Sequence, residues 1–188
     1  MTSDGPAEHH VELAGGRVHL FRGGAGEPLL FLHAAGGAGA WLDFHRLLAD
    51  SFDVIAPDHP GFGGSDDFPD VAAIDDLVFH YLDVLDALGL ERAHVVGASF
   101  GGWIAAELAV TAPHRIASLV LLSPAGLRLP DHPVPDIFLM TPDELAATLF
   151  QHPPTPAEPA RGAPDIDAIL AAYRDQTALA RFCWSPYL

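Results

Sequence analysis

Short apolar stretches alternate with longer segments of helical periodicity between about residues 28 and 126. The apolar stretches carry hydrophobic residues at consecutive positions, as expected for strands buried on both faces, and they read LLFLH, VIAPD, HVVGAS and IASLVLL. The segments between them are long enough for helical crossovers, which join parallel strands and cover both faces of a sheet. The alternation therefore predicts an α/β fold with a doubly wound, mostly parallel sheet. Ligands bind such sheets at the carboxyl ends of the strands.

The beginning of the chain has a different pattern. Strand-like segments at residues 10–14 and 17–23 flank the pair Gly15-Gly16, which is typical of a β-hairpin. The hairpin would add antiparallel strands to one side of the parallel sheet.

The sequence changes again after residue 126, where it becomes rich in proline and contains two helical segments, at 141–150 and 166–182. Thr141 and Glu144 have the spacing of a capping box at the start of the first of these helices. We therefore predict two parts: an α/β core over residues 1–126 and a helical cap or lid segment over residues 127–188.

The stretch HVVGASFGGW places the motif Gly-x-Ser-x-Gly at the junction between a strand and a helix. In this setting the motif is the signature of a nucleophile elbow, a turn so tight that its serine is strained. Side chains two residues before and after Ser99 would collide, which explains Gly97 and Gly101. The turn exposes the Ser99 hydroxyl beside the first N–H groups of the helix. The backbone N–H of Phe100 is therefore a candidate oxyanion donor.

With this elbow in its frame, the chain resembles the α/β-hydrolase family. LLFLHAAGG is similar to the family's third strand and oxyanion loop, VIAPDHPGFGGSD to its fourth strand and the following turn, and IASLVLLSPAG to its sixth strand. The resemblance implies that His33 supports the oxyanion loop, that the N–H of Ala35 is the second oxyanion donor, and that Ala34 is next in line. Ala34 stands where the family usually has glycine. Asp58 and His59 are expected to hold their turn by hydrogen bonds, with no catalytic role.

A serine nucleophile needs a base, and the base needs an orienting carboxylate. The resemblance places that acid after a seventh strand and the histidine after an eighth, and the sequence shows neither. The residues after Ser99 that could substitute are His114, His132, His152, Asp131 and Asp136. Two alternatives stay open: a fragment of a longer hydrolase, or a natural short form with an incomplete triad. The fragment is favoured because residues SLVLL would otherwise form an open apolar sheet edge.

The leading functional hypothesis is a serine hydrolase that acts on esters or related acyl and carbonyl compounds through an acyl-enzyme on Ser99. The resemblance associates aspartate at the elbow with dehalogenases and epoxide hydrolases, so a serine argues against both. Substrate contacts are predicted for Ala34, Phe100, Phe138, Met140 and Trp184, with Leu145, Phe150 and Tyr173 completing an apolar pocket. The same cap residues could instead form only the core of the cap. The alternative function is a catalytically incomplete fragment, or a hydrolase-like binding protein with no turnover.

Composition limits the partners and the compartment. The formal net charge is −16 and all nine basic residues are arginine, so the surface repels nucleic acid and anionic membranes. We expect a small-molecule substrate, no nucleic-acid or membrane partner, no cofactor and no metal, because neither phosphate-binding nor metal-ligand spacings occur. The lone Cys183 and the lack of a signal-peptide pattern predict a cytoplasmic protein, and the residue usage is typical of a GC-rich bacterial genome. The open sheet edge leaves a homo-oligomer as an option.

Overall fold

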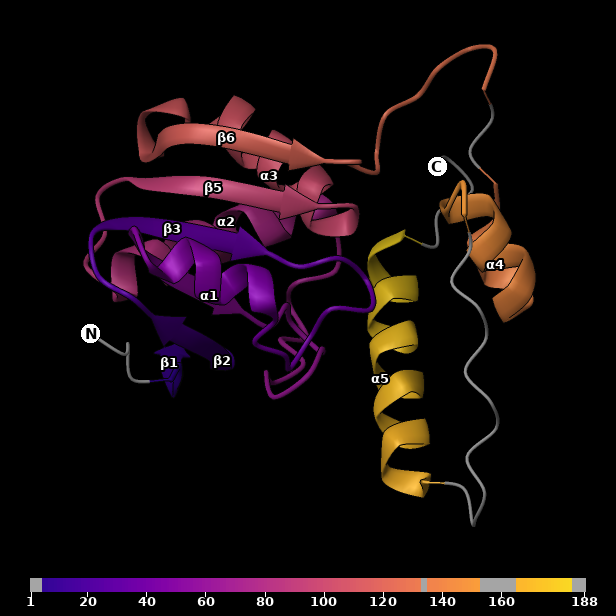
Figure 1. Ribbon diagram of the computed structural model, residues 1–188, viewed down its shortest axis with the longest axis horizontal. Helices are drawn as coiled ribbons and strands as arrows, with labels where there is room; N and C mark the ends of the chain where they lie inside the picture. The colour runs from indigo at the N-terminus through magenta and orange to yellow at the C-terminus, as the bar shows by residue number, and fades with distance from the viewer. Residues whose placement is uncertain (1–4, 133–134, 153–164, 184–188) are drawn as a thin grey trace.

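The computed structural model describes residues 5–132, 135–152 and 165–183. Its strands are β1 (Ala7–Leu13), β2 (Gly16–Gly23), β3 (Glu27–Leu32), β4 (Phe52–Pro57), β5 (Ala93–Ala98) and β6 (Ile116–Leu122). Its helices are α1 (Asp43–Ala49), α2 (Ile74–Ala87), α3 (Phe100–Thr111), α4 (Pro142–Leu149) and α5 (Ile166–Cys183), with short 3-10 helices η1 (Pro113–Arg115) and η2 (Ile137–Leu139). Helices cover both faces of one sheet, and α5 crosses beyond one end of it (Figure 1).

The strands of the described residues form a sheet in the order β1-β2-β4-β3-β5-β6. β3 pairs in parallel with β4 and β5, and β5 pairs in parallel with β6. The predicted hairpin is present as β1 and β2, and β2 joins β4 in antiparallel pairing. The predicted fold class, α/β with a doubly wound and mostly parallel sheet, is thus confirmed.

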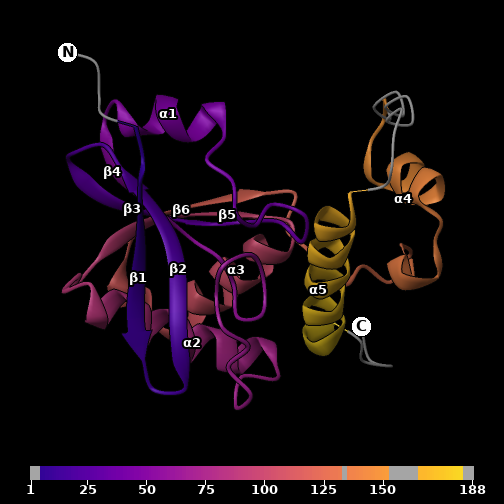
Figure 2. The ribbon, with the colours of Figure 1, turned by 90° about the horizontal axis from the view of Figure 1, so that it is seen from below.

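The core lies mainly between the sheet and the helices α2 and α3, while α1 covers the opposite face (Figure 2). Leu30 and Leu32 of β3 and Val95 of β5 are fully buried there with Leu77 of α2 and Ile104 of α3. Burial of this much aliphatic surface is the main favourable contribution to folding. It fixes the sheet, and with it the positions of the loops at the carboxyl ends of the strands.

The short helix α1 buries a polar ring and leaves apolar side chains at the surface. Trp41, Phe44, Leu47 and Leu48 have helical spacing, yet Phe44 and Leu47 are exposed. The residue of α1 that is buried is His45, whose ring packs against Phe31, Trp41 and Phe44. The helix has only seven residues, so a short register of hydrophobic residues cannot determine its buried face.

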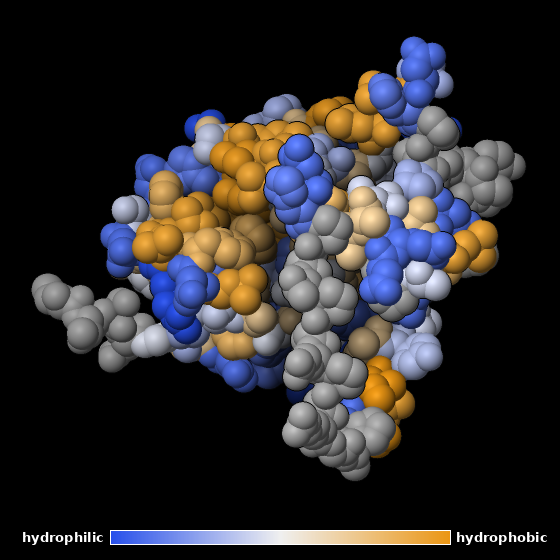
Figure 3. All heavy atoms as spheres, turned by 45° about the vertical axis from the view of Figure 1, so that its right-hand side comes forward, coloured by the Kyte–Doolittle hydropathy of each residue, from blue (hydrophilic) through white to orange (hydrophobic). Residues whose placement is uncertain are grey.

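β6 lies at an edge of the sheet and its second half is exposed. Leu119, Val120, Leu121 and Leu122 have exposed fractions between 37% and 48%, and apolar side chains gather along this upper side of the molecule (Figure 3). An edge strand with exposed apolar residues on both faces is open to pairing with further backbone. The predicted open edge is therefore present in the described structure.

The segment after β6 is mostly helical, as predicted. Thr141 caps α4 through its hydroxyl, which accepts from the Glu144 N–H, while the Glu144 carboxylate accepts from the Thr141 N–H at 2.8 Å. α5 lies across the carboxyl ends of the strands, and α4 lies on its far side (Figures 1 and 2). The division at residue 126 remains a prediction.

Candidate active site at the carboxyl end of the sheet

Ser99 occupies a strained turn between the end of β5 and the first residue of α3. Its backbone has φ +48° and ψ −112°, a region that residues with a side chain rarely occupy. The Ser99 N–H donates to Leu122 of the neighbouring strand at 2.9 Å, and the Ser99 carbonyl accepts from Ala125 at 2.9 Å and from Trp103 at 3.1 Å. The strain is therefore held on both sides of the residue by backbone hydrogen bonds.

The glycines around Ser99 are required by the closeness of the backbone. A Cβ atom on Gly97 would lie closer than 3.0 Å to the Gly101 carbonyl, and one on Gly101 would lie closer than 3.0 Å to the carbonyls of Leu32 and His33. A Cβ atom on Gly102 would come within 2.9 Å of Pro124. The motif thus brings β5, the loop after β3 and the start of α3 into direct backbone contact.

Two backbone N–H groups flank this turn. Phe100 is the first residue of α3, and the first N–H groups of a helix have no partner within the helix. On the loop after β3, the Ala34 carbonyl accepts from His33 Nδ1 at 2.6 Å and from the Gly37 N–H at 3.0 Å. Because a trans peptide points its C=O and N–H in opposite directions, these bonds turn the Ala35 N–H away from the His33 ring.

A buried pair of histidines lies under the elbow. His33 Nε2 accepts from the His59 N–H at 3.0 Å, and His59 Nε2 lies 2.9 Å from the His33 carbonyl. His59 Nδ1 is hydrogen-bonded to the Tyr81 hydroxyl. Burial lowers the pKa of both histidines, for His59 well below the usual value, and raises the pKa of Tyr81 well above its usual value. The cluster is consequently neutral at ordinary pH.

Asp58 joins three separate segments around the site. Its Oδ1 accepts from the Gly39 N–H at 2.6 Å, and its Oδ2 accepts from the Gly64 N–H at 2.8 Å. Oδ2 also lies 2.8 Å from Nδ1 of His19 on β2. The carboxylate thereby joins the loop after β3, the turn after β4 and the hairpin by hydrogen bonds. These hydrogen bonds are the structural role that the sequence predicts for Asp58.

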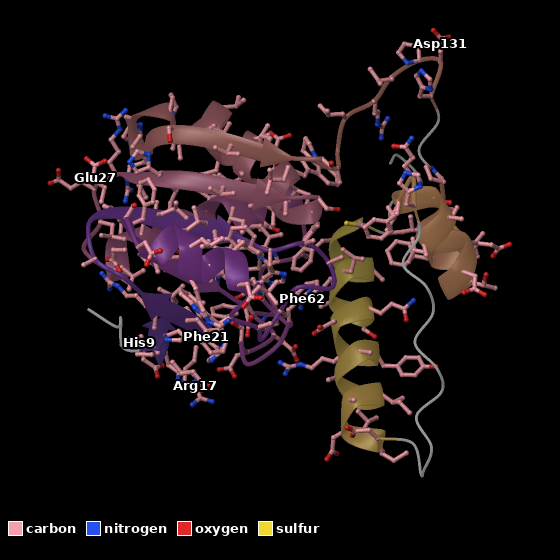
Figure 4. The ribbon with its side chains drawn as sticks, in the orientation of Figure 1. His9, Arg17, Phe21, Glu27, Phe62 and Asp131 are labelled. Atoms are coloured by element: carbon pink, nitrogen blue, oxygen red, sulfur yellow. The ribbon has the colours of Figure 1, made fainter. Side chains whose placement is uncertain are left out.

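α5 is attached to the turn after β4 by side chains that sequence reasoning missed. Arg174 donates to the carbonyls of Gly63 at 2.8 Å and Ser65 at 2.6 Å, and Asp175 accepts from the Gly63 N–H at 3.2 Å. Burial raises the pKa of Asp175. The helix lies beside the loop that carries Phe62 (Figure 4). Arg and Asp at consecutive positions on a helix give no signal, because their partners are backbone atoms more than a hundred residues away.

The apolar face of α5 reaches the elbow itself. Ala178, Leu179 and Phe182 are buried in the main core, and the ring of Phe182 lies 5.9 Å from the ring of Phe100. The Arg181 guanidinium lies over the Phe182 ring at 4.7 Å. The last turn of α5 therefore covers the side chain that follows Ser99.

The predicted substrate contacts of the cap differ in burial and in the residues that they touch. Phe138 is half-buried and packs against the main core, whereas Met140 contacts Thr148 of α4, with 3.7 Å between sulfur and hydroxyl. Trp184 lies outside the described residues. Phe150 and Tyr173 are exposed, so neither lines an enclosed pocket.

The residues considered as substitutes for the missing acid and base lie away from Ser99 or have other partners. His114 belongs to η1, beyond the far end of α3, and Asp131 lies on a loop that projects from the body of the molecule (Figure 4). Asp136 caps η2 through the Phe138 N–H. His132 and His152 are exposed. In residues 5–132, 135–152 and 165–183, no histidine ring is hydrogen-bonded to the Ser99 hydroxyl.

The described ranges contain no helix that is both long and apolar enough to cross a bilayer. Nor do they bring three His, Cys, Asp or Glu side chains together in a group that could hold a metal ion.

We expect stability to fall steeply in mild acid because of two other buried histidines. Burial lowers the pKa of His45 and of His80 to about 4, and one ring nitrogen of each has no partner. Below about pH 6.5 both histidines bind protons in the unfolded chain but stay neutral in the folded one. The free energy of unfolding therefore decreases as the pH falls from 6.5 to 4, and these histidines do not change it above pH 6.5. At pH 5 this should lower the free energy of unfolding by about 2 kcal/mol for His80, and by less for His45, whose charged form solvent screens more. Urea unfolding of His80→Met from pH 7.5 to 5 should show a shallower decline than the unsubstituted chain; parallel declines would contradict this.

The chain was compared with known proteins. Residues 27–186 match the family model of the alpha/beta hydrolase fold. The chain is 45% identical over 122 residues to a 2-hydroxymuconate semialdehyde hydrolase of Pseudomonas sp. (strain CF600), covering 62% of this chain and 43% of the relative. It is 37% identical over 122 residues to a 2-hydroxy-6-oxo-6-phenylhexa-2,4-dienoate hydrolase of Burkholderia cepacia, covering 59% of this chain and 41% of the relative.

The chain is also similar to solved structures. A meta-cleavage product hydrolase superposes with TM-score 0.58 at 32% identity, covering 65% of this chain and 47% of the other. A membrane phospholipase A superposes with TM-score 0.69 at 28% identity, covering 94% of this chain and 59% of the other. The chain spans less than half the length of these two curated relatives. The sheet order, the elbow and the family match together show that this chain belongs to the α/β-hydrolase fold family.

Proposed function

We propose that this chain carries the nucleophile and the oxyanion hole of a serine hydrolase. The observation that supports this most directly is the backbone of Ser99, which has φ +48° at the start of α3. The glycines two residues before and after it, Gly97 and Gly101, allow the close backbone contacts that hold this conformation. Strain of this kind costs on the order of 1–3 kcal/mol and persists where the surrounding structure imposes it. A purely structural turn would be more stable with glycine at this position.

The proposed reaction is acyl transfer to Ser99. The Ser99 Oγ attacks a carbonyl carbon, its proton passes to a base, and the N–H groups of Ala35 and Phe100 stabilise the oxyanion. The bond to the leaving group then breaks, and water hydrolyses the acyl-enzyme. His33 acts by orienting the Ala34–Ala35 peptide. The described residues supply no base to the Ser99 hydroxyl, so only the nucleophile and the oxyanion donors are assigned here.

The proposed substrates are esters, or dicarbonyl compounds whose carbon–carbon bond is cleaved. The relatives named above are hydrolases of 2-hydroxymuconate semialdehyde and of a 2-hydroxy-6-oxo-dienoate. Both types of bond are cleaved by attack on a carbonyl carbon, so the same elbow can serve either one. We propose that Phe138, Met140 and Trp184 contact the apolar part of the substrate beside Ala34. The sequence also predicts such a contact for Phe100, but its side chain is buried beneath Phe182 and only its backbone N–H is proposed to serve the site.

A second candidate is a hydrolase-like protein that binds such compounds without turnover. The observation that favours it is that no histidine of the described residues is hydrogen-bonded to the Ser99 hydroxyl.

A substrate panel separates the two candidates. p-Nitrophenyl butyrate and 2-hydroxymuconate semialdehyde are incubated with the chain and with Ser99→Ala, while product release and ligand binding are followed separately. We expect at least a stoichiometric release of product that Ser99→Ala abolishes. Binding with no Ser99-dependent product would instead establish the binding protein.

A further inference from the structure

The imidazole of His59 is a buried group that the proposed mechanism does not use. It is fully buried, and both of its ring nitrogens have side-chain or backbone partners: Nε2 the His33 carbonyl at 2.9 Å, Nδ1 the Tyr81 hydroxyl. Tyr81 comes from the middle of α2 and is also fully buried. A fully satisfied polar group of this kind fixes a single arrangement of the segments that it joins.

The partners determine which nitrogen of each ring carries the proton. A carbonyl oxygen can only accept, so His59 Nε2 must donate to His33, and Nδ1 must then accept from the Tyr81 O–H. His33 Nε2 accepts a hydrogen bond from the backbone N–H of His59. The His33 ring therefore carries its proton on Nδ1, which donates to the Ala34 carbonyl at 2.6 Å. Each ring is thereby a neutral imidazole in one defined tautomer.

The His33 carbonyl is the atom at which the two halves of the oxyanion hole meet. It accepts both the His59 Nε2–H and the backbone N–H of Gly101, the latter at 3.1 Å. Gly101 follows Phe100 at the start of α3, and His33 precedes the Ala34–Ala35 peptide. The ring of His59 also meets the Phe100 ring edge-on, with centroids 5.2 Å apart. Any displacement of the His33 carbonyl changes the spacing between the two N–H donors.

We propose that His59 is a positioning residue for the oxyanion hole, with the Tyr81 hydroxyl donating to the other ring nitrogen and holding the ring in place. The proposal rests on the proposed function of Ser99. The His59 Nε2–H holds the His33 carbonyl, and His33 in turn holds the Ala34 carbonyl, so the Ala35 N–H keeps its direction relative to the Phe100 N–H. Neither His59 nor Tyr81 touches the reacting atoms.

Three variants and one control separate positioning from plain stability. His59→Gln retains an N–H at the end of its side chain, His59→Met retains none, and Tyr81→Phe removes only the hydroxyl. His80→Met is the control, because His80 is equally part of the core of α2 but its Nε2 has no hydrogen-bond partner. For each protein we would measure the rate at which a fluorophosphonate labels Ser99, the nitrogen-15 shifts of the imidazoles and the free energy of unfolding.

We expect His59→Met to slow labelling about tenfold or more, since loss of a whole oxyanion donor costs ~100-fold or more in rate. His59→Gln should recover most of that rate, and His80→Met should label at the rate of the unsubstituted chain, whatever its effect on stability. Tyr81→Phe should leave His59 protonated on Nε2, since the His33 carbonyl can only accept, but it should loosen the ring and shift the Ala35 amide signal. Labelling of His59→Met at the rate of the control would overturn the proposal.

The two proposals fail in different ways. If the folded chain is not labelled at all, the proposed function of Ser99 fails. The protonated nitrogen of the His33 ring and the Ala35 amide signal then decide the role of His59. A His33 ring protonated on Nδ1, with an Ala35 amide that moves in Tyr81→Phe, supports positioning. An unmoved Ala35 amide, or His33 protonated on Nε2, overturns it. Tyr81→Phe also serves where His59→Met does not fold, because it removes one hydroxyl and keeps the ring.

Discussion

Gly101→Ala should lower the free energy of unfolding by about 3 kcal/mol or more. The new Cβ would lie closer than 3.0 Å to backbone atoms of both Leu32 and His33. Backbone at a strand end cannot move aside as a flexible side chain can, so β3 and α3 would have to separate. Urea unfolding monitored by circular dichroism measures the loss, and the substituted chain should be largely unfolded at 37 °C.

Gly36→Ala is the matched control for this substitution. Gly36 lies on the neighbouring loop, and a Cβ atom at that position would meet nothing within 4 Å. Its free energy of unfolding should stay within about 0.5 kcal/mol of the unsubstituted chain. Equal stability of Gly101→Ala and Gly36→Ala would show that the elbow is not under the steric constraint described here.

Asp58→Asn should lower the free energy of unfolding by about 2–4 kcal/mol, because the new amide N–H would face a buried backbone N–H. The Asp58 carboxylate accepts from the N–H groups of Gly39 and Gly64 on different oxygens. An asparagine amide has one acceptor oxygen, so either orientation of the amide turns an N–H toward one of these glycines. We also expect the oxyanion loop, which Gly39 holds in place, to become more mobile and its amides to exchange faster with solvent.

Asp66→Asn provides the comparison for an exposed carboxylate. Asp66 accepts from the Arg17 N–H at 2.9 Å, and that hydrogen bond lowers the pKa of Asp66. Because this bond is exposed to solvent, its loss should lower the free energy of unfolding far less than the change at Asp58 does. Chemical denaturation of both variants tests the difference, and a loss at Asp58 no larger than that at Asp66 would remove Asp58 from the role of joining the three segments.

The sequence was most informative where local chemistry alone determines the backbone. The alternation of strands and helices predicted the parallel sheet, and the glycines around Ser99 predicted a tight turn whose backbone contacts are now visible. The capping box at Thr141 belongs to the same class, since both partners lie within one helical turn. Features of this kind need no knowledge of distant residues.

Contacts between distant segments could not be predicted. The burial of His45 depends on the aromatic rings that surround it, and the attachment of α5 depends on backbone carbonyls of the turn after β4. The hydrogen bond between His59 and Tyr81 joins residues on different elements, and either residue alone resembles an ordinary core residue. In each case the sequence shows the group but not its partner.

The most direct test of the proposed role of Ser99 is the mass of the intact chain before and after treatment with a fluorophosphonate, followed by mapping of the modified peptide. A strained elbow serine beside the two proposed oxyanion donors should take up one adduct, located at Ser99 and absent from Ser99→Ala. A chain that is folded by circular dichroism yet gains no mass, or gains it at another residue, would contradict the assignment of Ser99 as a nucleophile.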